Sequence, residues 1–229
     1  MYITGGRIIL HIFLDFEMNP IAKSNKAAKA IAHNEIVEIG AVKLDEDYHL
    51  IDRFSCYVHP ELNIVMKDIT KLTGITQANV EYVSTLSTAL KEFTTWIGQD
   101  TVKIYSWSDS DKMQLFSECQ LKGIEVPNQF HRWMDFQRVY THLMGLSGRN
   151  CLSLKNAIGS VDQHFEGEQH RAVADAENAA SLLTLVKNKK AFQKRTQLIS
   201  NVFNASEPVV TTLGDLFADT FAKLNLQTA

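Results

Sequence analysis

The sequence is poor in cysteine. Only Cys56, Cys119 and Cys151 occur among 229 residues, and they lie far apart. No CxxC pair is present, so the spacing of a structural zinc site is missing and nothing indicates a disulfide framework. Isolated cysteines are typical of proteins that stay in a reducing compartment. We therefore expect an intracellular, cytoplasmic protein.

An excess of positive charge is also missing. The chain carries 23 lysines and arginines against 26 aspartates and glutamates, which gives a net charge of −3 at pH 7. Proteins that hold nucleic acid through a long-range field are normally basic. If the partner is a polyanion, the attraction must be local or carried by bound cations.

Long apolar stretches are absent as well. No run approaches the ~20 apolar residues of a membrane-spanning helix, and the N-terminus lacks the basic, apolar and small-residue regions of a signal peptide. We expect no membrane partner. The 45% of hydrophobic residues instead suffices for one sizeable core, or for a core domain with a small appendage.

The apolar segments that are present predict an α/β fold. Strands are expected at 7–16, 35–44, 51–59, 101–107 and 131–136, with helices at 86–98, 109–122, 136–144 and 172–188. The short connection after the second strand favours an antiparallel meander of strands 1–3. The later helical crossovers favour strands 4 and 5 parallel to strand 1. We predict a mixed five-stranded sheet flanked by helices, with a long basic loop at 18–34.

Two carboxylates close the first strand, in the stretch FLDFE at 13–17. Asp15 and Glu17 point to the same face because side chains alternate in a strand, and their Cα atoms are expected ~6.6–6.8 Å apart. Both can therefore reach one divalent cation at the crevice beyond a central strand. On these two residues alone, the start of a solvated loop is an equally good interpretation.

Further acids follow the fourth strand, in the stretch YSWSDSDKMQLF. Strand 4 is expected beside strand 1, so Asp109 and Asp111 come to the same crevice. One of them can serve only as the helix N-cap. We favour Asp109 as the cap and Asp111 as the ligand, and the reverse assignment stays open.

The stretch EQHRAVADAENAA supplies a histidine and a fifth acid. His170 and Asp175 are five residues apart, about 140° around a helix, so both reach one site only if His170 lies in the preceding loop. Taken singly, His170 is an ordinary surface or core histidine, and Asp175 is a first-turn acid favoured by the helix dipole. Four acids and a histidine in this order are harder to explain as separate structural residues.

These motifs resemble those of the DEDDh, or DnaQ-like, 3′–5′ exonucleases, which have an RNase H-like fold. DFE at 15–17 resembles the first motif, SWSDSDKMQL the second and HRAVADA at 170–176 the third. The resemblance runs from about residue 8 to 188. The SW before the second motif is similar to the subgroup that contains KapD and the eukaryotic histone-mRNA exonucleases.

The resemblance implies two-metal phosphodiester hydrolysis with Mg²⁺ or Mn²⁺. In that family pattern, Asp15 bridges both cations, Glu17 and Asp175 bind the cation that activates water, and Asp111 holds the second largely through water. His170 takes the proton of the attacking water. The expected activity is removal of nucleoside 5′-monophosphates from the 3′ end of single-stranded nucleic acid. RNA is favoured over DNA on the subgroup resemblance alone.

Other residues carry weaker substrate-binding predictions. Phe16 and Leu115 are candidates to flank the terminal base, with core packing as the alternative. Three basic residues, Lys23, Lys26 and Lys29, are candidates to meet phosphates, with a plain solvated loop as the alternative. Trp107 is interpreted as a core residue rather than a stacking platform.

Two other functions remain open from the sequence. One is a catalytically degenerate nucleic-acid-binding module. The other is a proofreading or processing subunit of a larger complex. We assign residues 1–195 to the exonuclease domain and 196–229 to a C-terminal helical extension. An apolar helical stripe on this extension is expected to dock on its own domain, on a second copy in a homodimer, or on a protein partner; it comprises Leu213, Leu216, Phe217, Phe221 and Leu224.

Overall fold

The computed structural model of the 229-residue chain describes residues 9–146, 151–161, 163–186, 190, 192 and 193. The C-terminal stripe and all of the predicted extension, 196–229, lie outside the described residues. Along the chain the elements are β1 (Ile9–Pro20), α1 (Lys26–Lys29), β2 (Asn34–Leu44), β3 (Leu50–Tyr57), α2 (Lys67–Thr73), α3 (Gln77–Val80), α4 (Leu86–Ile97), β4 (Thr101–Ser106), α5 (Asp109–Lys122), the 3₁₀ helix η1 (Asn128–His131), β5 (Trp133–Asp135), α6 (Phe136–Leu143), α7 (Leu154–Ser160) and α8 (Ala172–Val186).

The five strands form one mixed sheet in the order β3-β2-β1-β4-β5. β1 pairs antiparallel with β2 and parallel with β4, and β4 pairs parallel with β5. The predicted meander and crossovers are therefore confirmed. β1 lies at the centre, which places the end of its acidic segment among several neighbouring elements.

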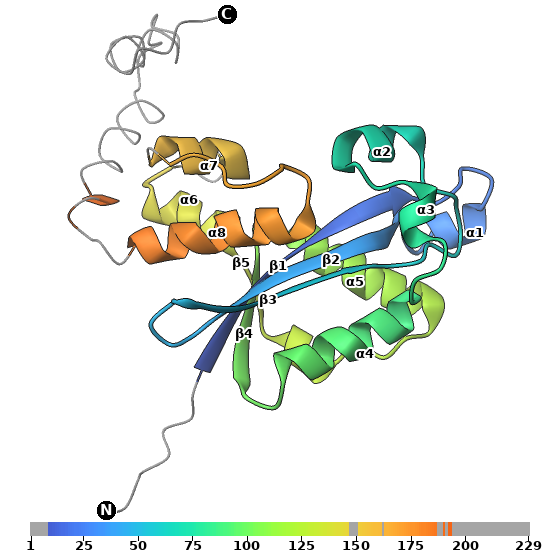
Figure 1. Ribbon diagram of the computed structural model, residues 1–229, viewed down its shortest axis with the longest axis horizontal. Coiled ribbons are helices and arrows are strands. Elements are labelled where there is room, and N and C mark those ends of the chain that lie inside the picture. The colour runs from blue at the N-terminus through green and yellow to red at the C-terminus, as the bar shows by residue number, and fades with distance from the viewer. Residues whose placement is uncertain (1–8, 147–150, 162, 187–189, 191, 194–229) are drawn as a thin grey trace, which may run out of the picture.

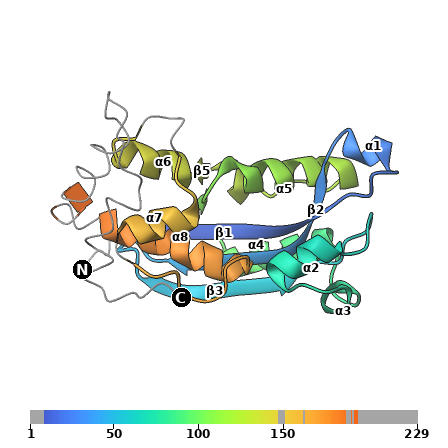
Figure 2. The same cartoon turned by 90° about the horizontal axis from the view of Figure 1, so that it is seen from above.

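The sheet is covered on both faces (Figure 1). Alternate β1 residues Ile12, Leu14 and Phe16 face a core built with α4 and α5. Phe13 faces the second core, which is built with α6, α7 and α8. Asp15 and Glu17 follow Phe13 on that second face, so the period-2 pattern directs both carboxylates toward α8. Figure 2 shows the same layers from above.

The prediction of a loop over 18–34 is wrong in part. β1 continues to Pro20 because it keeps pairing with the start of β2, down to the Pro20–Asn34 pair. The short helix α1 then forms, with the Asn25 side chain accepting from the Ala28 amide. Tertiary pairing has overridden the polar composition of this stretch.

Helix α5 is fixed to the start of β2 by a buried ionic cluster. The Lys122 ammonium lies 3.1 Å from Glu35, 2.8 Å from Glu61 and 2.9 Å from Glu118. Glu118 also accepts from the Ile36 amide at 2.8 Å. Because Glu35 and Glu118 are fully buried, these contacts hold the C-terminal end of α5 firmly against the start of β2.

Within the part of the chain that the structure describes, no helix is long and apolar enough to cross a membrane.

Candidate functional site

The acidic end of β1 opens into a pocket of about 260 Å³. Asp15, Glu17, Asp111, His170 and Asp175 all line it. The five residues come from β1, from the first turn of α5 and from the entry into α8. The structure thus brings together in one place the residues that the sequence pattern selected.

Asp111 reaches the pocket from the first turn of α5. It is buried, and its Oδ1 accepts a hydrogen bond from the backbone amide of Phe16 at 3.1 Å. The proposed cap is wrong: Ser108 caps α5 by accepting from the Ser110 amide, and Asp109 is an exposed first helical residue. The Phe16 amide therefore ties Asp111 directly to the backbone between Asp15 and Glu17.

His170 lies in the turn before α8, as its distance from Asp175 requires. Its φ is +62°, a left-handed conformation that side chains disfavour. The His170 amide donates to Asp175 Oδ2 at 2.9 Å, which closes the turn onto the helix. One ligand atom each of Glu17, His170 and Asp175 lie within 4.8 Å of one another.

Helix α8 approaches the sheet very closely at Gly40. A Cβ atom there would lie 2.0 Å from the Val173 backbone nitrogen and 2.1 Å from the Ala172 carbonyl carbon. Only glycine therefore permits this packing. The close approach brings Asp175 and the His170 turn within reach of the β1 carboxylates.

The crowded acids hold their protons more tightly than usual. Burial, followed by the charges of Asp175, Glu38 and Asp111, raises the pKa of Glu17 to about 8. Burial and then the neighbouring Asp111 raise the pKa of Asp15 well above its ordinary value.

The same effect extends to the other two acids. Burial raises the pKa of Asp175 to about 6, against the opposing hydrogen bond from the His170 amide. Burial also raises the pKa of Asp111, against the opposing bond from the Phe16 amide. These carboxylates are held together despite burial and mutual repulsion. They offer hard oxygen ligands of the kind that bind divalent cations. The residues present therefore fit metal binding.

A further acid, Glu38, was not selected from the sequence. It is fully buried on β2, directly opposite Glu17 in the strand pairing. Its charge raises the pKa of Asp15, Glu17 and Asp175. The available signal was an acid within the otherwise apolar stretch IVEIGAV, but only the strand register reveals its neighbour.

The aromatic and aliphatic candidates for substrate binding are largely core residues. Phe16 lines the pocket but is only 5% exposed, and its ring packs edge-on against Trp133. Leu115 is fully buried in the core and does not line the pocket, so the prediction that it flanks a base disagrees with its position. Trp107 is buried, as expected, and its indole donates to the Leu152 carbonyl.

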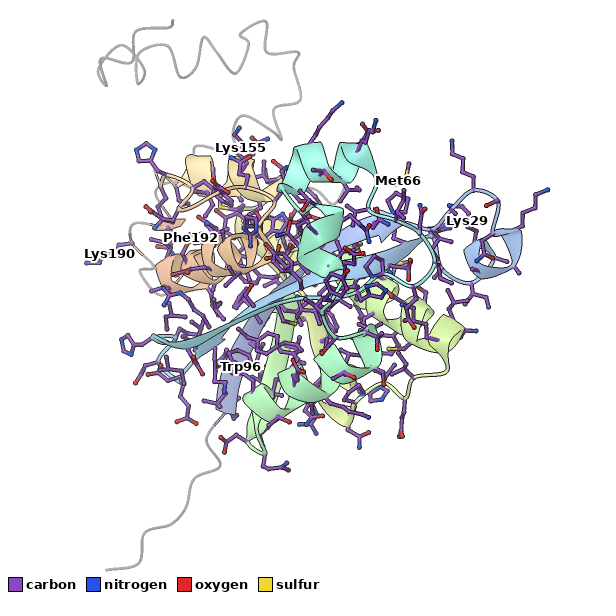
Figure 3. All side chains as sticks on the ribbon, turned by 45° about the vertical axis from the view of Figure 1, so that its right-hand side comes forward. Lys29, Met66, Trp96, Lys155, Lys190 and Phe192 are labelled. Carbon is purple, nitrogen blue, oxygen red and sulfur yellow. The ribbon has the colours of Figure 1, made fainter. Side chains whose placement is uncertain are left out.

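The three lysines do not line the pocket either. Lys26 and Lys29 belong to α1, and Lys23 precedes it. Figures 1 and 2 both place α1 at the far end of the sheet from α8, and Figure 3 shows Lys29 there at the edge of the molecule. Lys29 donates to the Ile21 carbonyl at 3.4 Å. Their predicted phosphate contacts are therefore not part of the site that the acids form.

Known proteins are similar to this chain in sequence and in fold. The profile of the exonuclease family RNase_T matches residues 12–183. ERI1 exoribonuclease 2 of Danio rerio is 26% identical over 194 residues, which is 75% of this chain and 34% of that protein. The 3′-5′ exonuclease Snipper of Drosophila melanogaster is 28% identical over 170 residues, 65% of this chain and 59% of that protein. The chain thus spans about a third to three-fifths of the length of these relatives.

A solved structure supports the same fold. The nuclease domain of 3′hExo, a DEDDh family member bound to rAMP, superposes with a TM-score of 0.68 at 22% identity. The match covers 82% of this chain and 96% of that one. At this identity the likeness establishes the shared fold, an RNase H-like sheet with flanking helices.

Proposed function

We propose a function from one premise: this chain belongs to the RNase_T exonuclease family, which includes the DEDDh 3′–5′ exonucleases. The proposed activity is metal-dependent hydrolysis of phosphodiester bonds from the 3′ end of single-stranded nucleic acid, with release of nucleoside 5′-monophosphates. One observation carries the proposal: four carboxylates and a histidine from three distant segments meet in one pocket.

Two divalent cations, Mg²⁺ or Mn²⁺, are the proposed cofactors. Asp15, Glu17, Asp111 and Asp175 would hold them, and Glu17 and Asp175 already lie close enough to share one ion. When bound, such cations activate water and stabilise the charge that develops on the phosphate. They also supply positive charge where the substrate lies, which a chain of net charge −3 otherwise lacks.

His170 is the proposed general base. It is exposed at the mouth of the pocket, so an unprotonated ring nitrogen can accept the proton of an attacking water. The contact between His170 and Asp175 is made by the His170 backbone amide and not by its ring. This contact holds the turn beside the acids. The histidine thus moves the proton while the acids hold the cations.

RNA is the favoured substrate. The relative from Danio rerio carries the name exoribonuclease, and the solved nuclease domain of 3′hExo holds rAMP. The pocket of about 260 Å³ is small, which suits one terminal nucleotide rather than a duplex. Single-stranded RNA with a free 3′ hydroxyl is therefore the first substrate to test.

The test uses RNA and DNA strands of the same sequence, labelled at the 5′ end. With Mg²⁺ or Mn²⁺ the full chain should shorten the strand stepwise from its 3′ end, and EDTA should stop the reaction. Asp15→Asn should reduce the rate at least ~10²-fold, on the scale of losing a main electrostatic catalyst. Strands that are retarded on a gel but stay intact would instead identify a binding module, and cuts in mid-chain would contradict the exonuclease assignment.

A further inference from the structure

Glu38 occupies an unusual position for an acid. It lies in the middle of β2, is fully buried, and faces the same side of the sheet as Gly40 two residues on. A buried carboxylate needs partners for both of its oxygens. The identity of these partners decides what Glu38 can do beside the catalytic pocket.

Both oxygens of Glu38 are bound by the segment that follows His170. Arg171 donates from Nη2 to Oε1 at 2.9 Å and from Nε to Oε2 at 3.4 Å. The Ala172 amide donates to Oε2 at 3.3 Å. Ser55 adds a hydroxyl contact to Oε1 at 3.5 Å. The two-pronged arginine contact fixes the orientation of both groups, because the guanidinium is planar and cannot lose its proton.

Arg171 is held on its other side as well. Its guanidinium lies 5.7 Å from the centre of the Tyr57 ring, and Tyr57 is the direct partner of Glu38 across the β2–β3 pairing. Stacking on an aromatic ring restricts the arginine further. The side chain of residue 171 is thus fixed by two neighbouring strands of the sheet.

These contacts act on the turn that carries His170. Ala172 is the first residue of α8, and its amide has no acceptor within the helix. The Glu38 carboxylate accepts from this amide and lies at the positive end of the helix dipole, where a negative charge is stabilised. Gly40, on the same face of β2, lets that turn approach the sheet. His170 precedes these anchors directly and keeps a left-handed backbone conformation that needs support from its surroundings.

We propose that Glu38 is a positioning residue: through Arg171 and the Ala172 amide it holds the left-handed turn that presents His170 to the pocket. This inference rests on the proposed function for its kinetic consequence. A role for Glu38 as a fifth metal ligand does not fit, because both of its oxygens already accept hydrogen bonds and the side chain is fully buried.

The test is Glu38→Gln, which keeps the shape of the side chain but removes the charge that pairs with Arg171. We expect kcat to fall about 10- to 100-fold, the scale of losing a supporting hydrogen-bond partner. KM should stay unchanged, and Mn²⁺ affinity, measured by calorimetry, should not fall toward that of Asp175→Asn. Arg171→Met is made in parallel, because it removes the same two bonds from a side chain that is 34% exposed.

A double-mutant cycle separates positioning from a general loss of structure. In a His170→Ala background, Glu38→Gln should cost no further activity if it acts through His170. Equal losses in both backgrounds would overturn the proposal. Loss of Mn²⁺ binding as severe as that of Asp175→Asn would also overturn it, since Glu38 would then act on the metal ligands.

The matched control is Glu177→Gln. Glu177 of α8 pairs with Arg53 of β3, with Nε 2.9 Å from Oε2, so it also ties α8 to the sheet through an Arg–Glu contact. That pair is exposed and lies away from the His170 turn. Its loss should leave kcat unchanged, and a fall as large as that of Glu38→Gln would show that any tie to α8 matters equally.

Hydrogen exchange tests the positioning without any reaction. In the wild-type protein the His170 amide is bound to Asp175, and in Glu38→Gln we expect faster exchange at residues 170–172 only. Unchanged exchange at these residues would contradict the proposal. A wild-type protein that hydrolyses neither RNA nor DNA would refute the proposed function, while this measurement would still decide the role of Glu38.

Discussion

Removing the charge of Glu17 should change how the stability of the metal-free protein depends on pH. The pKa of Glu17 is raised from 4.5 to about 8. Between these two pH values the folded state keeps a proton on Glu17 that the unfolded state has lost. Stability therefore falls as pH rises through this window, because the native state binds more protons than the unfolded state. The sign is opposite to that of a salt-bridged acid.

The size of the effect follows from the shift. Each pH unit between about 5 and 7 should cost roughly 1.4 kcal/mol of unfolding free energy, or about 2.7 kcal/mol over the range, as an upper bound. For a domain of this size, 1 kcal/mol corresponds to about 2–4 °C in melting temperature. The wild type should therefore lose about 5–10 °C more than Glu17→Gln over this range, with the variant more stable at neutral pH.

The assay is thermal unfolding followed by circular dichroism, with EDTA present, at pH 5, 6 and 7. Asp109→Asn serves as control, since Asp109 is an exposed acid at the start of the neighbouring helix α5. The melting temperature of Asp109→Asn should change with pH as that of the wild type does. Parallel curves for the wild type and Glu17→Gln would refute the description of Glu17 as a proton-holding acid in a crowded site. Addition of Mg²⁺ should flatten the wild-type curve.

Three further changes test other parts of the molecule. Gly40→Ala should lower the free energy of unfolding by about 3 kcal/mol, because its Cβ would overlap the α8 backbone. Gly159→Ala in α7 is the control: its Cβ would meet nothing within 4 Å, so it should not destabilise the protein, and urea unfolding compares the two variants. His170→Ala should slow hydrolysis ~10²–10⁴-fold but keep the Mn²⁺ affinity that Asp175→Asn loses. If calorimetry shows the two variants losing Mn²⁺ affinity equally, the histidine is a metal ligand. Lys122→Met should cost about 3–5 kcal/mol in urea unfolding, since it leaves buried carboxylates without their cation, and a neutral effect would show that they are protonated.

The sheet was predictable because its signals are local. The unbroken apolar run of β1, the short β2–β3 connection and the helical crossovers each follow from a few neighbouring residues, and together they predict the arrangement of the strands. The end of β1 was not predictable, because residues 18–20 are strand only through pairing with 34–36 of β2.

The acids of the candidate site were predictable from the sequence. The contacts that hold the acids and His170 in place were less so. The position of Asp15 and Glu17 on one face follows from the strand period, and the spacing of His170 and Asp175 already required a turn before α8. The Ser108 cap is a local contact to the Ser110 amide, but the stretch SWSDSD offers several capping residues and does not select one of them. The left-handed φ of His170 depends on contacts made after folding. Glu38 was missed for the same reason, since its partner Arg171 lies 133 residues away.

The site also has a consequence for the order of events in synthesis. The bond from the Phe16 amide to Asp111 spans 95 residues, and the bond from the Ala172 amide to Glu38 spans 134. Contacts of such long range form late, because loop closure must precede them. Of the residues that the structure describes, β1 leaves the ribosome first and the turn with His170 comes much later. A nascent or truncated chain that ends before α8 therefore has Asp15, Glu17 and Asp111 but lacks Asp175, so the proposed hydrolytic activity would begin only once α8 has docked.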